Sequence, residues 1–217
     1  GSLALVGIMM ALYRREKTGT GDFLDMAMTD SLMSWNPHIV SNVLAENRAP
    51  ELERERLYGG AAFYNVYATA DARHIVLSGA EMNFVENLLT ALERPDLIAV
   101  GRLPWGPDQA PLKAFLRDTF ATRTMQEWDA WLADKGVCYA PVFDLHEAWE
   151  QPYLRERGIV ETGADGVERL GTPVRFRHEP GQASDKLSEL GADTEALLER
   201  LGYDAPARAG LRAAGVC

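Results

Sequence analysis

Side chains that could do chemistry are spread thinly along this chain of 217 residues. Glu81 comes directly before an expected helix, where a carboxylate favours the helix dipole and needs no other purpose. No neighbouring cation in the sequence would activate the Cys138 thiol, which apolar residues flank, so we interpret it as a core residue. The histidines have no ligand spacing and no cysteine pair beside them: His38, His74, His146 and His178. Taken alone, these residues predict no metal site and no reactive thiol.

Two further groups of residues invite a chemical reading and have simpler explanations. Thr18-Gly-Thr-Gly21 has the composition of a phosphate-binding loop. It follows an expected helix and precedes an expected strand, the reverse of the order that aims a helix N-terminus at phosphate, so we expect a helix cap and a turn. Three aspartates are explained as a strand residue, a helix cap and a turn residue: Asp25, Asp30 and Asp71.

The first 57 residues are predicted to hold a helix, a strand and a second helix. Leu3–Lys17 is apolar nearly all round and predicts a core helix, about half the roughly 20 residues that a bilayer span requires. Phe23–Met28 predicts a short strand and Ser31–Glu46 a helix, and the charged run Asn47–Leu57 predicts a solvated linker. We expect core packing for the methionines near the start: Met9, Met10, Met26, Met28 and Met33.

The rest of the chain predicts an α+β module with further elements behind it. Phe63–Thr69 and His74–Ser78 predict a hairpin with a short loop. Helices are expected at Met82–Leu92, Pro111–Phe120, Thr124–Asp134, Leu145–Trp149 and within Asp193–Ala214. Strands are expected at Val137–Ala140, Ile159–Thr162, Val167–Leu170 and Val174–Phe176.

Composition narrows the class of protein. The chain is 47% hydrophobic and 25% charged, which is ordinary for a globular fold. Its net charge of -10 disfavours nucleic acid, anionic membranes and other polyanions, so an anionic substrate needs a local basic pocket that no cluster in this chain obviously supplies. Two cysteines, Cys138 and Cys217, imply no disulfide framework and fit a reducing cytoplasm.

One ungapped stretch carries a resemblance to a known family. It runs from Leu57 to Glu81 as Leu-Tyr-Gly-Gly-Ala-Ala-Phe-Tyr-Asn-Val-Tyr-Ala-Thr-Ala-Asp-Ala-Arg-His-Ile-Val-Leu-Ser-Gly-Ala-Glu. Further matching blocks stand in the family's order: Thr18–Met28, Ala140–Ala148, Arg175-Phe176, Leu201–Tyr203 and Leu211–Val216. The whole chain thus resembles the C-terminal part of the family III CoA-transferases, and within them is most similar to the alpha-methylacyl-CoA racemases.

The resemblance implies an α/β fold with a small α+β domain, built by two interlocked protomers. Its expected parts are a large-domain remnant at 1–28, a helical linker at 29–57, the small domain at 58–150 and a return linker with a C-terminal segment at 151–217. It also implies that the CoA-binding part, a catalytic Asp and the racemase His lie before Gly1. We therefore expect a homodimer, or a second chain that supplies those bases.

The resemblance also assigns the site residues. Glu81 matches a glutamate that supports the His base in the partner's site. Leu57, Gly59, Gly60, Tyr64 and Ala80 match substrate-binding positions, and Ala80 is smaller than the usual Ile. The sequence departs from the family at other positions: Tyr58 stands for Asp, Ala62 for Pro, Ala72 for a turn Gly, and Met82-Asn83 for Pro-Gln.

The activity implied is inversion at the α-carbon of a 2-methyl-branched acyl-CoA thioester through an enolate, with no metal or cofactor beyond coenzyme A as carrier. Two alternatives stay open. One is transfer of CoA between carboxylic acids through an acyl-aspartyl intermediate, although those enzymes usually carry a glycine-rich loop where this chain has Gly79-Ala-Glu-Met-Asn83. The other is a non-catalytic fragment or subunit that dimerises or completes another chain's site.

Overall fold

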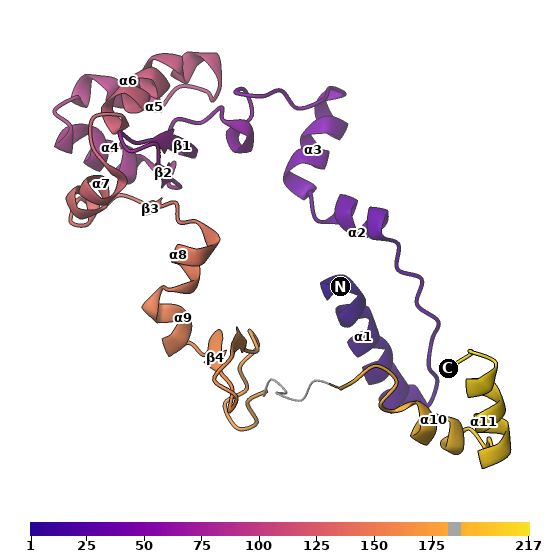
Figure 1. Cartoon of the computed structure of the whole chain (residues 1–217). Helices are drawn as coiled ribbons and strands as arrows, with labels where there is room; N and C mark the ends of the chain where they lie inside the picture. Colours follow the sequence, from indigo (N-terminus) through magenta and orange to yellow (C-terminus); the bar gives the residue numbers. More distant parts are fainter. Residues whose placement is uncertain (182–187) are drawn as a thin grey trace. The chain divides into compact units, whose positions relative to one another are not determined.

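The computed structural model describes residues 1–181 and 188–217. The chain divides into two compact units, residues 1–142 and residues 143–217, and each is described by itself. Figure 1 labels the elements in chain order. The predicted division into four segments has different boundaries from these two units and stays a prediction.

The first unit opens with three helices that bury none of their residues. They are α1 (Ser2–Thr18), α2 (Met28–Ser34) and α3 (Pro37–Glu46). Gly19 ends α1 at a φ of 72°, so the predicted cap and turn are confirmed. The single helix expected over Ser31–Glu46 is wrong, because Pro37 begins a new helix after Asn36.

Three expectations for this opening segment differ from the structure. Phe23–Met28 forms no strand with any described residue, although Leu24 and Met26 pack against Gly7 of α1. No residue of α1 is buried, so the predicted core helix is exposed in the described chain. The methionines expected in the core are exposed too: Met9, Met10, Met26, Met28 and Met33. A side chain is buried only where other elements cover it, and within residues 1–142 the main core lies elsewhere.

The core of the first unit forms around a small antiparallel sheet. β1 (Asn65–Ala68) pairs with β2 (His74–Leu77), which pairs with β3 (Tyr139–Pro141). Asn65 lies opposite Leu77, and Leu77 lies opposite Tyr139. The predicted hairpin and third strand are confirmed.

Helices gather beside this sheet, as Figure 1 shows. They are α4 (Met82–Ala91), α5 (Ile98–Gly101), α6 (Ala110–Phe120) and α7 (Met125–Leu132). The 3-10 turns η2 (Pro95–Leu97) and η3 (Pro107–Gln109) lie between them, and a further one, η1 (Arg56–Tyr58), precedes β1. The three longer helices confirm the sequence prediction. Val85, Leu88 and Leu89 recur on one face of α4 and are buried. Thr124 begins α7 with a capping box to Glu127.

Aromatic rings fill the centre of this core. Tyr67 stacks on Phe120 with ring centroids 5.3 Å apart, and Phe120 meets Trp128 edge to face at 5.0 Å. The Tyr67 hydroxyl donates to the Ala62 carbonyl at 2.7 Å, and burial raises the pKa of Tyr67 above its usual value. Trp128 Nε1 donates to the Phe120 carbonyl at 2.8 Å, so the buried polar atoms of both rings are satisfied.

The second unit is made of short elements. α8 (Leu145–Trp149) and α9 (Pro152–Glu156) precede a hairpin of β4 (Val160–Thr162) and β5 (Glu168–Leu170), and α10 (Thr194–Arg200) and α11 (Ala205–Ala213) follow. These confirm the expected helix at Leu145 and the first two strands. The third expected strand, Val174–Phe176, is wrong, because it is irregular backbone, and Asp193–Ala214 forms two helices.

Across residues 1–181 and 188–217, no helix combines the length and the apolar character needed to cross a membrane.

Candidate functional site

Two buried polar side chains, Lys113 of α6 and Gln109 of η3, hold the chain between Glu53 and Ala62. Lys113, only 7% exposed, donates from Nζ to the Gly59 carbonyl at 3.1 Å. Gln109 accepts from the Ala62 backbone N–H at 2.9 Å and donates to the Leu103 carbonyl at 2.8 Å. A buried backbone group without a partner is costly, so these bonds fix the path of the chain through the family-like Gly-Gly-Ala-Ala run.

Both glycines of this run are required by the backbone. Gly59 has a φ of 85°, which favours glycine over other residues. A Cβ on Gly60 would overlap the backbone of Arg54 and Glu55. The Gly60 N–H donates to the Glu55 carbonyl, and the Gly60 carbonyl accepts from the Gly106 N–H at 3.0 Å. Of the predicted substrate-binding residues, these two therefore shape the loop through their backbone.

This loop presents Arg56 and Leu57 to a hollow of about 450 Å³. Leu57, Tyr64 and Trp105 form walls of the hollow, and α3 contributes Ile39. The Arg56 guanidinium carbon lies 4.8 Å from the Tyr64 ring centroid and 5.6 Å from that of Trp105. Leu57 and Tyr64 were assigned to one site only through the family resemblance, and in the structure both line this hollow.

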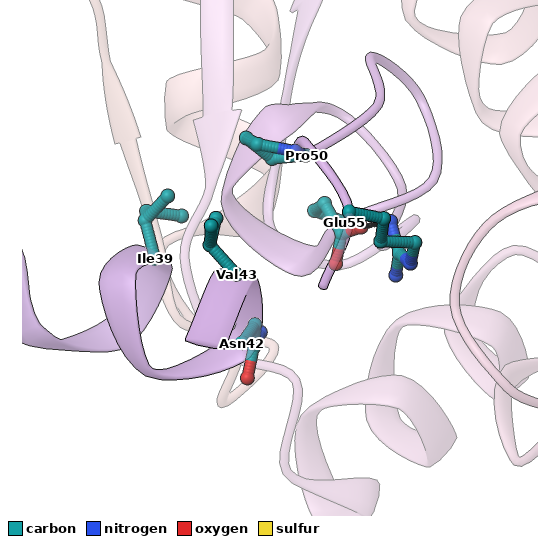
Figure 2. Close-up of a pocket in the computed structure, with 6 residues that line it drawn as sticks. Ile39, Asn42, Val43, Pro50 and Glu55 are labelled. Atoms are coloured by element: carbon teal, nitrogen blue, oxygen red, sulfur yellow. Dashed lines mark hydrogen bonds and ion pairs between the residues drawn. The ribbon is translucent and has the colours of Figure 1, made fainter. Parts of the chain in front are cut away.

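A narrow second gap of about 10 Å³ adjoins this hollow and shares Ile39 and Glu55 with it. Figure 2 shows Ile39 and Val43 on α3 and the Glu55 side chain across the gap. The Glu55 carboxylate pairs with Arg48 at 2.6 Å and its side chain is 14% exposed. The hydrogen bond to Glu55, and a second to Glu46, raise the pKa of Arg48. The negative charge of Glu55 is thereby matched by Arg48.

Glu81 and Ala80 lie at a different point, where β2 leads into α4. Neither is among the residues that line the hollow beside Leu57, whereas the next residue, Met82, shares a second hollow with Trp105. Glu81 is the N-cap residue of α4, as expected, and its side chain makes no capping hydrogen bond. Its exposed carboxylate is therefore not engaged by the helix that follows it.

The backbone around Glu81 is tightly set. A Cβ on Gly79 would come closer than van der Waals contact to the Phe84 ring and to Cys138 Cβ. The Glu81 carbonyl accepts from the Phe84 and Val85 N–H groups. α4 is anchored in turn by its buried apolar face, so the position of Glu81 is fixed by core packing.

The remaining candidates have structural surroundings. Cys138, expected in the core, is half-buried, with Sγ 3.3 Å from Ser78 Oγ. Asp71 is a turn residue as expected and accepts from Thr69 Oγ1 and the Met125 N–H, bonds that lower its pKa. Among the described residues, no three His, Cys, Asp or Glu side chains are grouped so as to hold a metal ion.

The chain belongs to CoA-transferase family III, whose family model matches residues 1–194. Human alpha-methylacyl-CoA racemase is 27% identical over 210 residues, covering 94% of this chain and 53% of that protein. Two transferases are as similar. Succinyl-CoA:mesaconate CoA-transferase of Haloarcula marismortui is 27% identical over 93% of this chain and 52% of its own length, and acetyl-CoA:oxalate CoA-transferase of Acetobacter aceti is 28% identical over 88% and 51%.

Solved structures agree with the fold. A CAIB/BAIF family protein from Brucella suis matches with a TM-score of 0.68 at 25% identity, covering 91% of this chain and 53% of that chain. The chain spans about half the length of the curated relatives it matches. The predicted family and the predicted fold class, helices with a small sheet in the family III fold, are confirmed.

Sequence reasoning missed the residues that build the hollow around Leu57 and Tyr64. Trp105 lies far along the chain, and Arg56 was interpreted as part of a solvated charged run. Arg56 is in fact half-buried, whereas Glu51 and Glu53 in that run are exposed. The available signal was at the start of α6, where the N-cap residue Gln109 stands four residues before Lys113 and near the apolar positions Leu112 and Leu116. Polar residues on a buried helix face need partners, which here are backbone groups of the site loop.

Proposed function

We propose that this chain forms the acyl-side part of an enzyme that inverts the α-carbon of a 2-methyl-branched acyl-CoA thioester. The observation that carries the proposal is Glu81, whose exposed carboxylate is held in place by a rigid backbone and is not used to cap α4. Glutamate is not among the preferred N-cap residues, so capping of α4 does not account for this side chain. Similarity to alpha-methylacyl-CoA racemase over most of the chain supports the same activity.

The chemistry is proton removal and return at one carbon. Loss of the α-proton from a thioester gives an enolate, so the reaction needs two positioned bases and groups that stabilise charge on the thioester oxygen. In our proposal Glu81 holds or shares the proton of a histidine base that lies outside these residues. The site is then completed by a second protomer of a homodimer.

The hollow beside Leu57 and Tyr64 would take the acyl chain. Its volume lies within the range of pockets that enclose small ligands, and its walls combine apolar and aromatic side chains with polar and charged ones. The chain's net charge of -10 offers little general attraction for the phosphates of CoA. We therefore assign the CoA moiety to residues outside this chain, with CoA as the acyl carrier and no other cofactor.

The second candidate is transfer of CoA between carboxylic acids. The specific observation that favours it is that CoA-transferases match this chain at the same level of identity as the racemase. An aspartate outside these residues would attack the thioester and form an acyl-aspartyl anhydride. The loop Gly79–Asn83 bears on this choice, because Gly79 is fixed by packing against Phe84 and Cys138 and Glu81 fills the next exposed position.

One experiment separates these functions. The protein as encoded by its gene is incubated with a chiral 2-methylacyl-CoA in heavy water, with and without an acceptor acid, and α-deuterium and CoA distribution are followed together. Deuterium uptake without acceptor supports inversion, and CoA transfer with the α-proton retained supports the transferase. Neither reaction, at concentrations that permit a dimer, would support a non-catalytic role.

A matched pair of variants tests Glu81 itself. Glu81→Gln is expected to slow α-exchange by about 10²-fold or more, the usual range for a group that assists proton transfer. Glu86→Gln on the same helix, an exposed residue paired with Arg102, should leave exchange unchanged. Equal loss of exchange and of CoA binding in Glu81→Gln would contradict a role confined to proton transfer.

A further inference from the structure

The positively charged side chain of Arg56 lines the hollow, and one of its hydrogen-bond donors has no partner among the described residues. Its guanidinium lies against Tyr64 and Trp105. Its Nε is buried and, within the described residues, has no hydrogen-bond partner. A buried donor without a partner costs free energy, so such a group in a cavity wall points to a ligand that supplies the acceptor.

The acidic residue nearest to Arg56 in sequence is paired with a different cation. Glu55 also lines the hollow, but its carboxylate is paired with Arg48 at 2.6 Å. The bond to Arg48 holds the Glu55 carboxylate, and Glu55 also lines the narrow gap in Figure 2. The hollow therefore retains a positive charge at Arg56 in a chain whose net charge is -10.

The shape of the cation selects the chemistry of the anion. The guanidinium carbon lies 4.8 Å from one ring centroid and 5.6 Å from the other. A guanidinium is a planar fork of N–H donors, which matches a carboxylate in two parallel bonds. Leu57, Ile39 and the two rings supply the apolar part of the wall, which His38, Asn42 and Glu55 also line. A short hydrocarbon chain that ends in a carboxylate fits both features, whereas a CoA phosphate would be expected to gather several cations.

We propose that this hollow recognises acyl groups that carry a second carboxylate at their far end, with Arg56 as the residue that binds it. The inference rests on the proposed function only in taking the bound molecule to be an acyl-CoA. It narrows the substrate class from branched acyl chains in general to those that end in an acid. The same recognition would serve inversion or CoA transfer.

Equilibrium binding tests this without any turnover. Glutaryl-CoA, pentanoyl-CoA and free CoA are titrated by calorimetry into the protein as encoded by its gene. Glutaryl-CoA and pentanoyl-CoA have five-carbon acyl chains, and only the former ends in a carboxylate. Wild-type protein is expected to bind glutaryl-CoA about tenfold or more tightly than pentanoyl-CoA, in keeping with a hydrogen bond between charged groups.

Arg56→Gln should remove that preference, weakening glutaryl-CoA about tenfold and leaving pentanoyl-CoA and free CoA within about twofold. Arg56→Lys should retain part of it, because the charge remains and the fork is lost. Arg94→Gln is the control, since Arg94 also stacks on a ring, at 4.7 Å from Phe115, and does not line the hollow. Thermal melting of each variant reports folding, and if Arg56→Gln does not fold, the wild-type and Arg56→Lys preferences decide.

Three results would overturn the inference: no preference for glutaryl-CoA in the wild type, equal weakening of both thioesters in Arg56→Gln, or a parallel loss of free CoA, which would identify a phosphate site. The outcome is separable from the proposed function. If Arg56→Gln loses the preference for glutaryl-CoA and the protein shows neither α-exchange nor CoA transfer, the inference stands and the proposed enzymatic function is wrong. If α-exchange or CoA transfer occurs and the wild-type protein shows no preference for glutaryl-CoA, the proposed function stands and the inference is wrong.

Discussion

Helices α1 and α4 are both rich in apolar residues, and only one of them is buried. α1 has 17 residues, none buried, and exposes Leu5, Met9 and Met10. α4 has 10 residues and buries Val85, Leu88 and Leu89 on one face. Apolar composition alone predicts that a helix is buried somewhere. A stripe of apolar residues at helical spacing identifies the face that packs against neighbouring elements of the same chain.

The contrast extends to the segments around each helix. No residue is buried in residues 1–59, whereas, among the described residues, all 18 buried hydrophobic, polar or charged residues other than Val160 lie between Ala61 and Leu132. The stability of residues 1–142 should therefore depend on the sheet and on α4, α6 and α7. The exposed apolar face of α1 contributes little to folding of residues 1–217, whatever it contacts elsewhere.

The largest expected effect compares the two helices directly. Leu88→Ala should lower the free energy of unfolding by about 2 to 5 kcal/mol, because a fully buried leucine leaves a cavity. Leu5→Ala on α1, where the leucine is 60% exposed, should change it by less than about 0.5 kcal/mol. Urea unfolding of residues 1–217 measures both. Equal losses would show that α1 is part of the folded core.

A smaller effect is expected at the loop that carries Arg56 and Leu57. Gln109→Ala leaves the Ala62 N–H and the Leu103 carbonyl without their partner and should cost about 1 to 3 kcal/mol. Gln126→Ala, an exposed change on α7, should be nearly neutral. Unfolding in urea separates the two variants. A neutral Gln109→Ala would mean that the loop keeps its path without this side chain.

Much of the core could be predicted from sequence because its signals are local. Hairpin alternation located β1 and β2, and the apolar stripe located α4. The helical pattern from Thr124 located α7, and the structure adds a capping box between Thr124 and Glu127. The errors arose where local signals lacked a partner, as in the extended segment Phe23–Met28, or where Pro37 interrupts a helical pattern.

The candidate site was harder to predict because its parts are distant in sequence. Gln109 reaches a backbone group 47 residues away, and Trp105 meets Arg56 across a similar separation. No periodicity within a window of a dozen residues encodes such contacts. The family resemblance supplied Leu57, Tyr64 and Glu81. Arg56 is a candidate only from the structure, where it lies over the Tyr64 ring and its Nε has no partner among the described residues.

A still smaller effect concerns the hairpin turn, where the chain has an alanine in place of the family's usual glycine. Ala72 has a φ of 59°, a left-handed conformation that costs a residue with a Cβ roughly 1 to 2 kcal/mol. Ala72→Gly should therefore raise the free energy of unfolding, by about 1 kcal/mol after the added freedom of the unfolded chain is subtracted. Ala70→Gly in the same turn should lower it slightly. Thermal melting of the pair checks the sign, and destabilisation by both would refute the strain.

The smallest effect is a pH dependence at the same turn. Thr69 and the Met125 N–H hydrogen-bond Asp71 and lower its pKa from the ordinary value of 3.8. A depressed folded pKa means that the folded state favours the charged form, so the stabilisation is complete above about pH 4 and is lost as pH falls through the folded pKa. Asp71→Asn should therefore destabilise the protein more at pH 6 than at pH 3, whereas Asp118→Asn, exposed on α6, should show a smaller difference. Urea unfolding at the two pH values measures this. A gap between wild type and Asp71→Asn that stays constant with pH would assign the role of Asp71 to its shape alone, and would leave the link between the hairpin and α7 independent of charge.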